Sequence, residues 1–224
     1  MANLIKTYSS LLDWYFQLGI DTFIQKKPRN RLSVNGLNNL KKSLDNLNNI
    51  ELKKNAKNLV FSDGAPKAKI MLIGEAPGYE EDLSGIPFVG QAGKKLDQMI
   101  NAIGLNRKKN VYITNILPWR PPNNRTPTED EISFFLPYVE KHIAIIHPII
   151  ILLFGNVASK AILNKKGITN FHGEWFKYKN PYLNEKINVM CIFHPSFILR
   201  SPEKKKNVWE DLKKVKIKIN ELGI

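Results

Sequence analysis

The chain has 224 residues, 43% of them hydrophobic, and carries a formal net charge of +14. This length fits one domain with a sizeable core, and the apolar content excludes a largely disordered chain. No run of eighteen or more apolar residues occurs, so we expect no membrane span. The positive charge suits a polyanionic partner such as nucleic acid; a compositional bias toward lysine is the alternative source of this charge.

The cysteine content and the first residues bear on the compartment. Residues 1–20 are amphipathic and lack a compact apolar stretch after basic residues, so they do not resemble a secretory signal. Cys191 is the single cysteine, which excludes an intramolecular disulfide and is consistent with a reducing environment. We therefore expect a cytoplasmic protein, and we expect it to be a monomer.

Helices and strands are expected to alternate along most of the chain. Apolar residues recur at helical spacing over residues 4–19, a basic linker follows over 21–36, and a second helix is expected over 37–48. Thr128 precedes three acidic residues, which is typical of a helix start. The other expected elements are strands near 69–73, 110–115, 149–154 and 189–193, and helices near 91–104, 128–146, 155–164 and 203–221. Short strands separated by helices indicate an α/β fold whose short, mostly parallel, four-stranded sheet is covered on both faces.

Acidic side chains gather directly after the first expected strand of this sheet. Glu75 lies at the carboxyl end of that strand. Glu80, Glu81 and Asp82 follow in a loop rich in glycine and proline, which continues as Gly-Ile-Pro-Phe-Val-Gly over 85–90. Open α/β sheets place their ligands at this edge, and carboxylates that repel one another suit a site better than they suit packing. A solvated acidic loop is the alternative.

His194 takes the corresponding place after the strand near 189–193. It opens the sequence His-Pro-Ser-Phe-Ile-Leu-Arg, which ends at Arg200. A single histidine in such a place is more often a satisfied core side chain. A second polar segment at the carboxyl end of another strand favours a common site.

Together the two segments resemble the motifs of the uracil-DNA glycosylase superfamily, and they are most similar to its type 4 branch. There the first motif begins Gly-Glu-x-Pro-Gly and the last reads His-Pro-Ser. Tyr112-Ile-Thr-Asn115 and the run from Arg120 to Thr128 extend the resemblance, which covers about residues 60–200 in the family's order.

The resemblance implies both a fold and an activity. The fold would be a three-layer α/β/α sandwich, with residues 1–58 as a helical extension and basic linker packed on a catalytic domain over 59–224. The activity would be that of an enzyme of base excision repair, which flips uracil out of DNA and hydrolyses its N-glycosidic bond to leave an abasic site.

Three side chains would contact uracil according to this resemblance. Phe88 matches the position that stacks on the base, Asn115 the one that reads its edge, and His194 the one that donates to O2 of the leaving anion. The Asn115 amide can accept from uracil N3–H and donate to O4, an arrangement that cytosine cannot satisfy. The alternatives are that Phe88 is a core ring and that Asn115 is a turn residue at a strand end.

Carboxylates of the first motif are implied to position the attacking water and to stabilise the cationic sugar. The best-known branch uses an aspartate at the position of Ala76, so that role cannot be carried over, and Ala76 is expected only among the residues around uracil. Glu75 and Glu81 are the candidates, and the sequence does not rank them.

Contacts with DNA are expected mainly from the segment that follows His194. Ile198 matches the family's intercalating leucine, with Leu199 beside it, and apolar wedges of this kind kink DNA. The run from Lys204 to Lys206 either meets phosphates or forms only the solvated face of a terminal helix. The expected DNA-contacting residues are Ser196, Ile198, Leu199, Arg200 and Arg125.

The chain departs from the type 4 branch in its cysteines, because that branch usually carries a four-iron cluster held by four of them. Trp119 stands where one ligand is common, and a second falls near Phe134 or Phe135. The other pair is expected within residues 44–58, which contain no cysteine, and Cys191 matches none of these places. We therefore expect no 4Fe-4S cluster and no metal site, with apolar packing in its place.

Two functions from different classes remain open on the sequence: a uracil-DNA glycosylase, and a catalytically weak or silent DNA-binding relative. Relatives that trap a covalent intermediate carry a basic insertion with a nucleophilic histidine after the asparagine strand. Here Asn115 leads directly into Ile-Leu-Pro-Trp, so we expect turnover by a monofunctional enzyme. The intact set of Glu75, Glu81, Phe88, Asn115 and His194 favours the enzyme over the silent binder.

Overall fold

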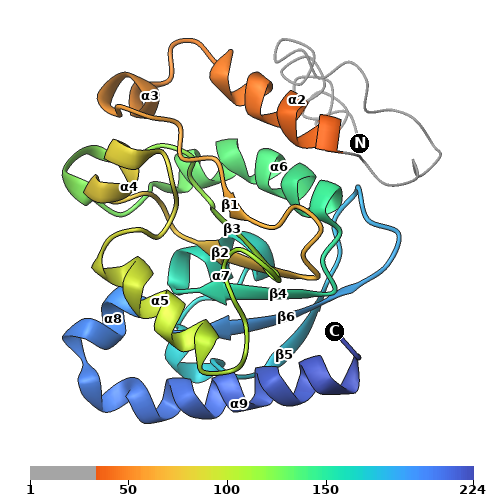
Figure 1. The fold of residues 1–224 in the computed structure, drawn as a ribbon. Coiled ribbons are helices and arrows are strands. Elements are labelled where there is room, and N and C mark those ends of the chain that lie inside the picture. Colours follow the sequence, from red (N-terminus) through yellow and green to blue (C-terminus); the bar gives the residue numbers. More distant parts are fainter. Residues whose placement is uncertain (1–33) are drawn as a thin grey trace, which may run out of the picture. The chain divides into compact units, whose positions relative to one another are not determined.

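The computed structural model describes residues 34–224, and a six-stranded sheet lies at its centre (Figure 1). The strand order is β1-β3-β2-β4-β6-β5. The four inner strands are parallel, whereas β1 and β5 pair antiparallel at the two edges. The strands are β1 (Asp63–Gly64), β2 (Ile70–Gly74), β3 (Val111–Asn115), β4 (Ile150–Phe154), β5 (Trp175–Tyr178) and β6 (Ile187–Ile192).

The sheet has six strands and not the predicted four, because the prediction missed the two edge strands. The inner four lie where apolar runs predicted them. β1 has two residues, and β5 leaves three of its four side chains partly or fully exposed, so neither produces an apolar run of the kind that marks a buried strand.

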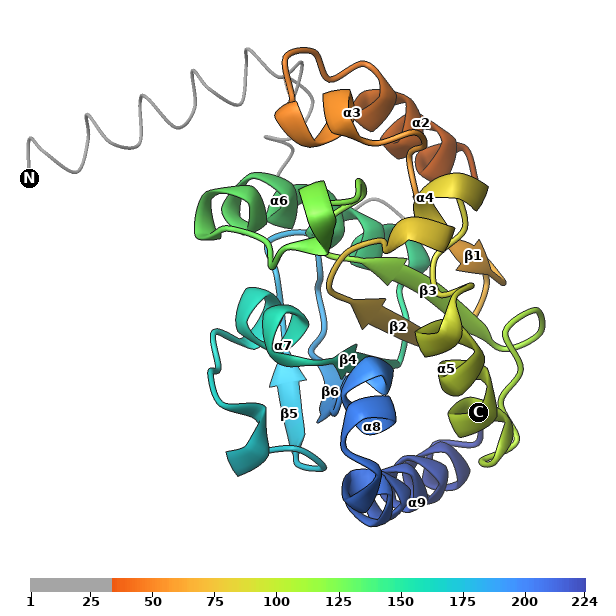
Figure 2. The ribbon, with the colours of Figure 1, turned by 90° about the vertical axis from the view of Figure 1, so that its left-hand side faces the viewer.

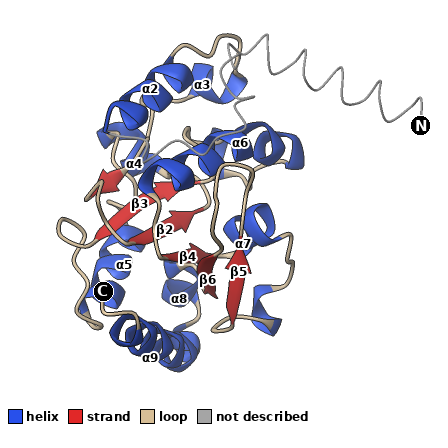
Figure 3. Ribbon diagram, turned by 90° about the vertical axis from the view of Figure 1, so that its right-hand side faces the viewer, coloured by secondary structure: helices blue, strands red, loops and turns tan. Residues whose placement is uncertain are grey.

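Helices cover both faces of the sheet, which confirms the predicted α/β/α sandwich (Figures 2 and 3). The chain steps from β2 to β3 in one direction and then back past β2 to β4. Right-handed crossovers therefore place α5 and α6 on opposite faces. α7 packs against α6, and α8 packs against α5. The α-helices are α2 (Val34–Asp45), α3 (Glu51–Asn55), α4 (Tyr79–Ser84), α5 (Gln91–Asn101), α6 (Glu129–Ile146), α7 (Asn156–Leu163), α8 (Pro195–Arg200) and α9 (Lys205–Glu221), with 3-10 turns at Pro122–Asn124, Ile168–Asn170 and Pro202–Lys204.

The core follows from this layering. Every residue of β2, β3 and β4 is buried, as expected for parallel strands covered on both faces. The predicted start of α6 is confirmed: the Thr128 hydroxyl accepts from Glu131 N–H, and the Glu131 carboxylate accepts from Thr128 N–H.

The segment before the sheet belongs to the same unit as the sheet. α2 begins three residues earlier than the predicted helix, and it packs against α6 through an apolar face that includes Leu37, Leu40 and Leu44. The helix predicted over residues 4–19 and most of the basic linker lie outside the described residues, so the division at residue 58 stays a prediction. Within residues 34–224 no helix has the length and apolar character needed to span a bilayer.

Candidate active site

The four parallel strands end at the same edge of the sheet, and each brings a residue to that edge. β2 ends at Gly74 and is followed by Glu75, β3 ends at Asn115, Gly155 follows β4, and His194 lies two residues beyond β6. The chain then runs from β2 and β6 toward α5 and α8, but from β3 and β4 toward α6 and α7 (Figure 2). Where loops from neighbouring strands lead to opposite faces of an open α/β sheet, the crevice between them commonly binds ligands.

The Asn115 carboxamide is buried and has an atom without a partner. Only 5% of the residue is exposed, and in the described part of the chain its Oδ1 is the one buried side-chain oxygen or nitrogen that makes no hydrogen bond. Gly74 on the adjacent strand makes room for it, since a Cβ there would lie 2.4 Å from Asn115 Oδ1 and 2.4 Å from Phe88 Cζ. An unpaired buried oxygen costs about 1–3 kcal/mol, which a ligand donating to it would recover.

The Phe88 ring reaches the same place from the loop after α4. Its ring centroid lies 5.8 Å from that of His194, with 31° between the ring planes, and 6.5 Å from that of Phe154. Phe88 is buried, and its φ of +55° puts a bulky residue in the left-handed region of the backbone, where it is uncommon. Asn115, Phe88 and His194, which were predicted to contact one ligand, are thus neighbours.

Glu81 holds the loop that carries this ring. Its Oε2 accepts from Gly78 N–H at 3.0 Å, and its Oε1 accepts from Val89 N–H and Gly90 N–H at 2.9 Å each. Both oxygens of this buried carboxylate are therefore engaged by the backbone, at the start of α4 and directly after Phe88.

His194 has a defined tautomer. It is the N-cap residue of α8, and its Nδ1 lies 3.2 Å from Ser196 N and 2.8 Å from Ser196 Oγ. Because a backbone N–H can only donate, Nδ1 is the acceptor, and the proton of the neutral ring is on Nε2. Burial lowers the pKa of His194 to about 4; the positive charge of Arg200 adds to this shift, and the negative charge of Glu81 opposes it. The ring is a neutral Nε2–H donor near pH 7.

Gly155 provides the surface against which this imidazole rests. A Cβ at Gly155 would lie 3.2 Å from His194 Cβ and 3.6 Å from its Cδ2, and Gly155 has a φ of +92°. A side chain at this position would be strained and would also push the histidine. The glycine therefore helps to determine where Nε2–H points.

Glu75 differs from Glu81 in the contacts of its carboxylate. Among residues 34–224 its carboxylate forms no hydrogen bond or ion pair, and burial alone raises its pKa above the usual range. Its backbone carbonyl accepts from Leu117 N–H at 3.0 Å, which fixes Glu75 beside the loop that follows Asn115. Ala76, next in the chain, is partly exposed.

The structure corrects the expected wedge residue. Ile198 is 1% exposed, whereas Leu199 is 45% exposed. α8 begins at Pro195, so Ile198 faces inward, where the helix packs against α5, and Leu199 and Arg200 face outward. Ile198 is a core residue in this structure, and Leu199 is the exposed apolar side chain of α8. Ser196 is engaged with His194.

Arg125 is exposed and lies in the loop before α6. Its guanidinium forms a two-pronged ion pair with Glu131, with nitrogen–oxygen distances of 2.6 and 2.8 Å. This pair raises the pKa of Arg125 and lowers that of Glu131. A contact between Arg125 and DNA stays a prediction, and it would have to compete with Glu131.

The positions where cluster ligands were expected are occupied by aromatic packing. Trp119 and Phe135 are buried, and their rings meet edge-on with centroids 5.7 Å apart. Phe134 lies edge-on to Phe135 at 4.9 Å, and Lys53 Nζ lies 5.8 Å from the Trp119 ring. None of these side chains is a thiolate, and Cys191 lies within β6, so the residues of this region do not fit a 4Fe-4S cluster.

Three residues of the site escaped prediction. Gly74 and Gly155 each stand at the end of a buried apolar run, and glycine at that place was the available signal. Arg107, which holds the loop of Phe88, lies in the run Asn-Arg-Lys-Lys-Asn, where nothing separates it from solvated charges.

The family model described as the uracil DNA glycosylase superfamily matches residues 61–213. A type-4 uracil-DNA glycosylase of Sulfurisphaera tokodaii is 46% identical over 165 residues, covering 71% of this chain and 74% of the relative. Enzymes of the same name from Saccharolobus solfataricus (43% over 166 residues, 71% and 76% covered) and Archaeoglobus fulgidus (38% over 170 residues, 74% and 84% covered) are also similar.

Proposed function

The chain belongs to the uracil-DNA glycosylase superfamily, and on that premise we propose that it removes uracil from DNA by hydrolysing the N-glycosidic bond. The observation that carries this proposal is the buried, unpaired Oδ1 of Asn115 beside the Phe88 ring. A flipped uracil would stack on Phe88 and donate its N3–H to this oxygen, while the Asn115 amide donates to uracil O4. Cytosine has no hydrogen at N3, so it would leave the oxygen unpaired.

His194 would serve the leaving group. When the bond between sugar C1′ and uracil N1 breaks, the electron pair goes to the base, and charge develops on its O2. A neutral Nε2–H held by the contact between Ser196 N–H and His194 Nδ1 is suited to donate there. The lowered pKa of His194 supports this role, because the ring would keep a single proton, on Nε2, throughout the reaction.

Glu75 is the better of the two candidates for positioning water. Its carboxylate is free to accept from a water molecule, whereas both oxygens of Glu81 already accept backbone N–H groups. The water oxygen would bond to C1′ while Glu75 takes up its proton, and the carboxylate would also stabilise the positive charge that develops on the sugar. We assign Glu81 to holding the loop of Phe88.

DNA would be held by the exposed end of α8. Leu199 is placed to act as the wedge in the stack, and Arg200 is exposed beside it. The formal charge of +14 on the chain favours binding of the phosphate backbone, so we expect the affinity to fall as salt is added.

The test is release of uracil from a labelled oligonucleotide that contains one uracil, followed by alkali to cut the abasic product. We expect cleavage of both the single strand and the U·G duplex, and no cleavage before alkali, as suits a monofunctional enzyme. Binding of this DNA without release of uracil would identify a silent relative and overturn the proposal. Asn115→Ala is the control that ties any activity to this site.

A further inference from the structure

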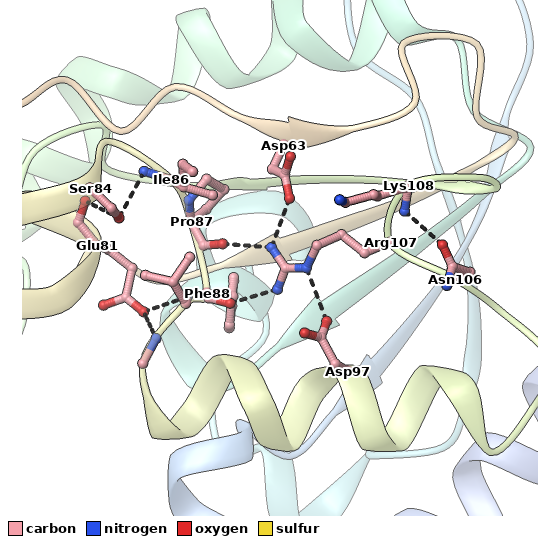
Figure 4. A network of polar contacts seen from close by, with 12 residues as sticks. Asp63, Glu81, Ser84, Ile86, Pro87, Phe88, Asp97, Asn106, Arg107 and Lys108 are labelled. Carbon is pink, nitrogen blue, oxygen red and sulfur yellow. Dashed lines mark hydrogen bonds and ion pairs between the residues drawn. The ribbon is translucent and has the colours of Figure 1, made fainter.

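Arg107 lies beneath the loop of Phe88 and contacts four groups at once (Figure 4). One nitrogen, Nη1, donates to Pro87 O at 2.8 Å and to Asp63 Oδ2 at 3.0 Å. Another, Nη2, donates to Phe88 O at 2.6 Å, and Nε donates to Asp97 Oδ1 at 3.0 Å. The side chain is 14% exposed, so these contacts are largely shielded from water.

The two carbonyls that Arg107 binds flank a residue with an unfavourable backbone. Phe88 has a φ of +55°, a conformation that costs a bulky residue free energy unless its surroundings enforce it. Gly93 lies against the same peptide, since a Cβ there would lie 1.9 Å from Phe88 O. Two features therefore hold the backbone conformation of Phe88 on its carbonyl side: the hydrogen bond from Arg107, and the absence of a side chain at Gly93.

Glu81 completes the restraint from the other end of the loop. It accepts from Val89 N–H and Gly90 N–H, whereas Arg107 donates to Pro87 O and Phe88 O. Two side chains of opposite charge thus bind four consecutive residues, and Figure 4 shows both at the same loop. The backbone on both sides of the Phe88 ring is therefore restrained.

We propose that Arg107 is a positioning residue for uracil removal, which acts by holding Phe88 where the flipped base will stack. The inference rests on the proposed function. Asp63 and Asp97 orient and neutralise the guanidinium, so its remaining N–H groups face the two carbonyls. Lysine cannot replace it, because a single ammonium cannot span two carboxylates and two carbonyls in this fork-like arrangement.

The experiment measures the single-turnover rate of uracil release at saturating enzyme for wild type, Arg107→Lys, Phe88→Leu and the double variant. Affinity for an oligonucleotide with a tetrahydrofuran abasic site, and the melting temperature, are measured alongside. Val215→Ala, in the buried face of α9 far along the chain from this loop, is a control for lost stability alone.

We expect Arg107→Lys to lower the rate by about ten- to a hundredfold, since misplacing a group by about 1 Å can cost a hundredfold. Affinity for the abasic oligonucleotide should change less than about twofold, because the Arg107 guanidinium is already engaged by four protein groups and is 14% exposed. In the Phe88→Leu background the same substitution should add less than about twofold, because its effect operates through that ring. Val215→Ala should lose stability and keep its rate.

Equal losses in the two backgrounds, or an undiminished rate in Arg107→Lys, would overturn the inference while leaving the proposed function intact. No release of uracil by the wild type would instead overturn the function on which it rests. If Arg107→Lys does not fold, Asp97→Asn on the surface of α5 takes its place, with a smaller loss expected and the same comparison in the Phe88→Leu background.

Discussion

The backbone N–H of Ser196 donates to Nδ1 of His194 across 3.2 Å. This contact leaves the neutral imidazole one position for its proton, Nε2, and so makes that nitrogen the donor that we propose for the leaving base. The chemistry assigned to His194 thus depends on a backbone group that substitution of the Ser196 side chain does not remove.

His194→Ala should lower the single-turnover rate on uracil by about 10²–10³-fold, the usual cost of removing one donor to a developing anion. Ser196→Ala should cost far less, since its N–H still fixes the tautomer. The pKa of His194 is lowered to about 4, so the ring is neutral above that pH, and its titration should leave no inflection between pH 5 and 9. An inflection near pH 6.5 that disappears in His194→Gln would contradict this assignment.

Glu75→Gln and Glu81→Gln should have opposite effects on stability. Burial raises the pKa of Glu75 in the folded protein above its value in the unfolded chain. At a pH between these two pKa values the unfolded state binds fewer protons than the folded state, so the free energy of unfolding falls as the pH rises through that range. Glu75→Gln removes this cost, so it should melt higher than wild type at pH 7 and equally at acid pH. Glu81→Gln places an amide donor against backbone N–H groups and should lose about 1–3 kcal/mol.

The variants Glu75→Gln and Glu81→Gln also test which of the two carboxylates positions the attacking water. Glu75→Gln should lose about 10²–10⁴ in rate despite its higher melting temperature, the range typical of general-base assistance. The wild-type rate should fall as pH drops through the raised pKa of Glu75, and the variant should lack this acid limb. A full rate in Glu75→Gln would return the water-positioning role to Glu81.

Asn115→Asp should weaken uracil release and relax the rejection of cytosine. A protonated aspartic acid can donate to cytosine N3 while its other oxygen accepts from N4–H, whereas the charged form repels the leaving anion. The residual activity should therefore be low and rise as pH falls. Each lost contact should cost about 1–3 kcal/mol of transition-state stabilisation, measured on matched uracil and cytosine oligonucleotides. Wild-type uracil kinetics in this variant would remove Asn115 from the site.

Neighbouring residues of α8 should respond differently to truncation. Leu199→Ala should stay within about 0.5 kcal/mol of wild-type stability, yet it should release uracil from duplex about tenfold more slowly, because unstacking costs a few kcal/mol per step. Ile198→Ala should lose about 2–5 kcal/mol, because it empties a core position. Denaturant titration and duplex kinetics measure the two effects, and the reverse pattern would restore Ile198 as the wedge.

Protein purified in air should contain no stoichiometric iron by elemental analysis and should be colourless. Trp119 and Phe135 fill the places of two expected ligands and pack against each other. Iron at four atoms per chain would show that other groups of the chain hold the cluster.

The sequence was sufficient for the inner sheet and for three of the residues that gather at its carboxyl edge. The runs that became β2, β3, β4 and β6 are mostly apolar, because parallel strands are buried on both faces, so these strands could be recognised without knowledge of the fold. Phe88, Asn115 and His194 were expected from the family resemblance, and the structure brings them together; their contacts with uracil stay a prediction.

The difference in exposure between Ile198 and Leu199 has a simple geometric cause. α4 and α8 are six-residue helices inside motif loops, too short for apolar periodicity to mark them. Each helical residue turns the side-chain direction by about 100°, so Ile198 and Leu199 could be told apart only once the start of α8 at Pro195 was known. Arg107 could not be predicted for another reason. It donates to backbone carbonyls, and every residue has one, so the sequence does not indicate which residues Arg107 contacts.

His194 is also the cap of the helix that carries Leu199 and Arg200. A rotation of the imidazole away from Ser196 would uncap α8 and leave the N–H of its first turn unpaired. The imidazole that we propose as the donor to the leaving base is therefore coupled, through the first turn of α8, to the two residues that we propose as contacts with the DNA strand. On that proposal, a base that displaced the His194 ring would also weaken the hold of α8 on the DNA.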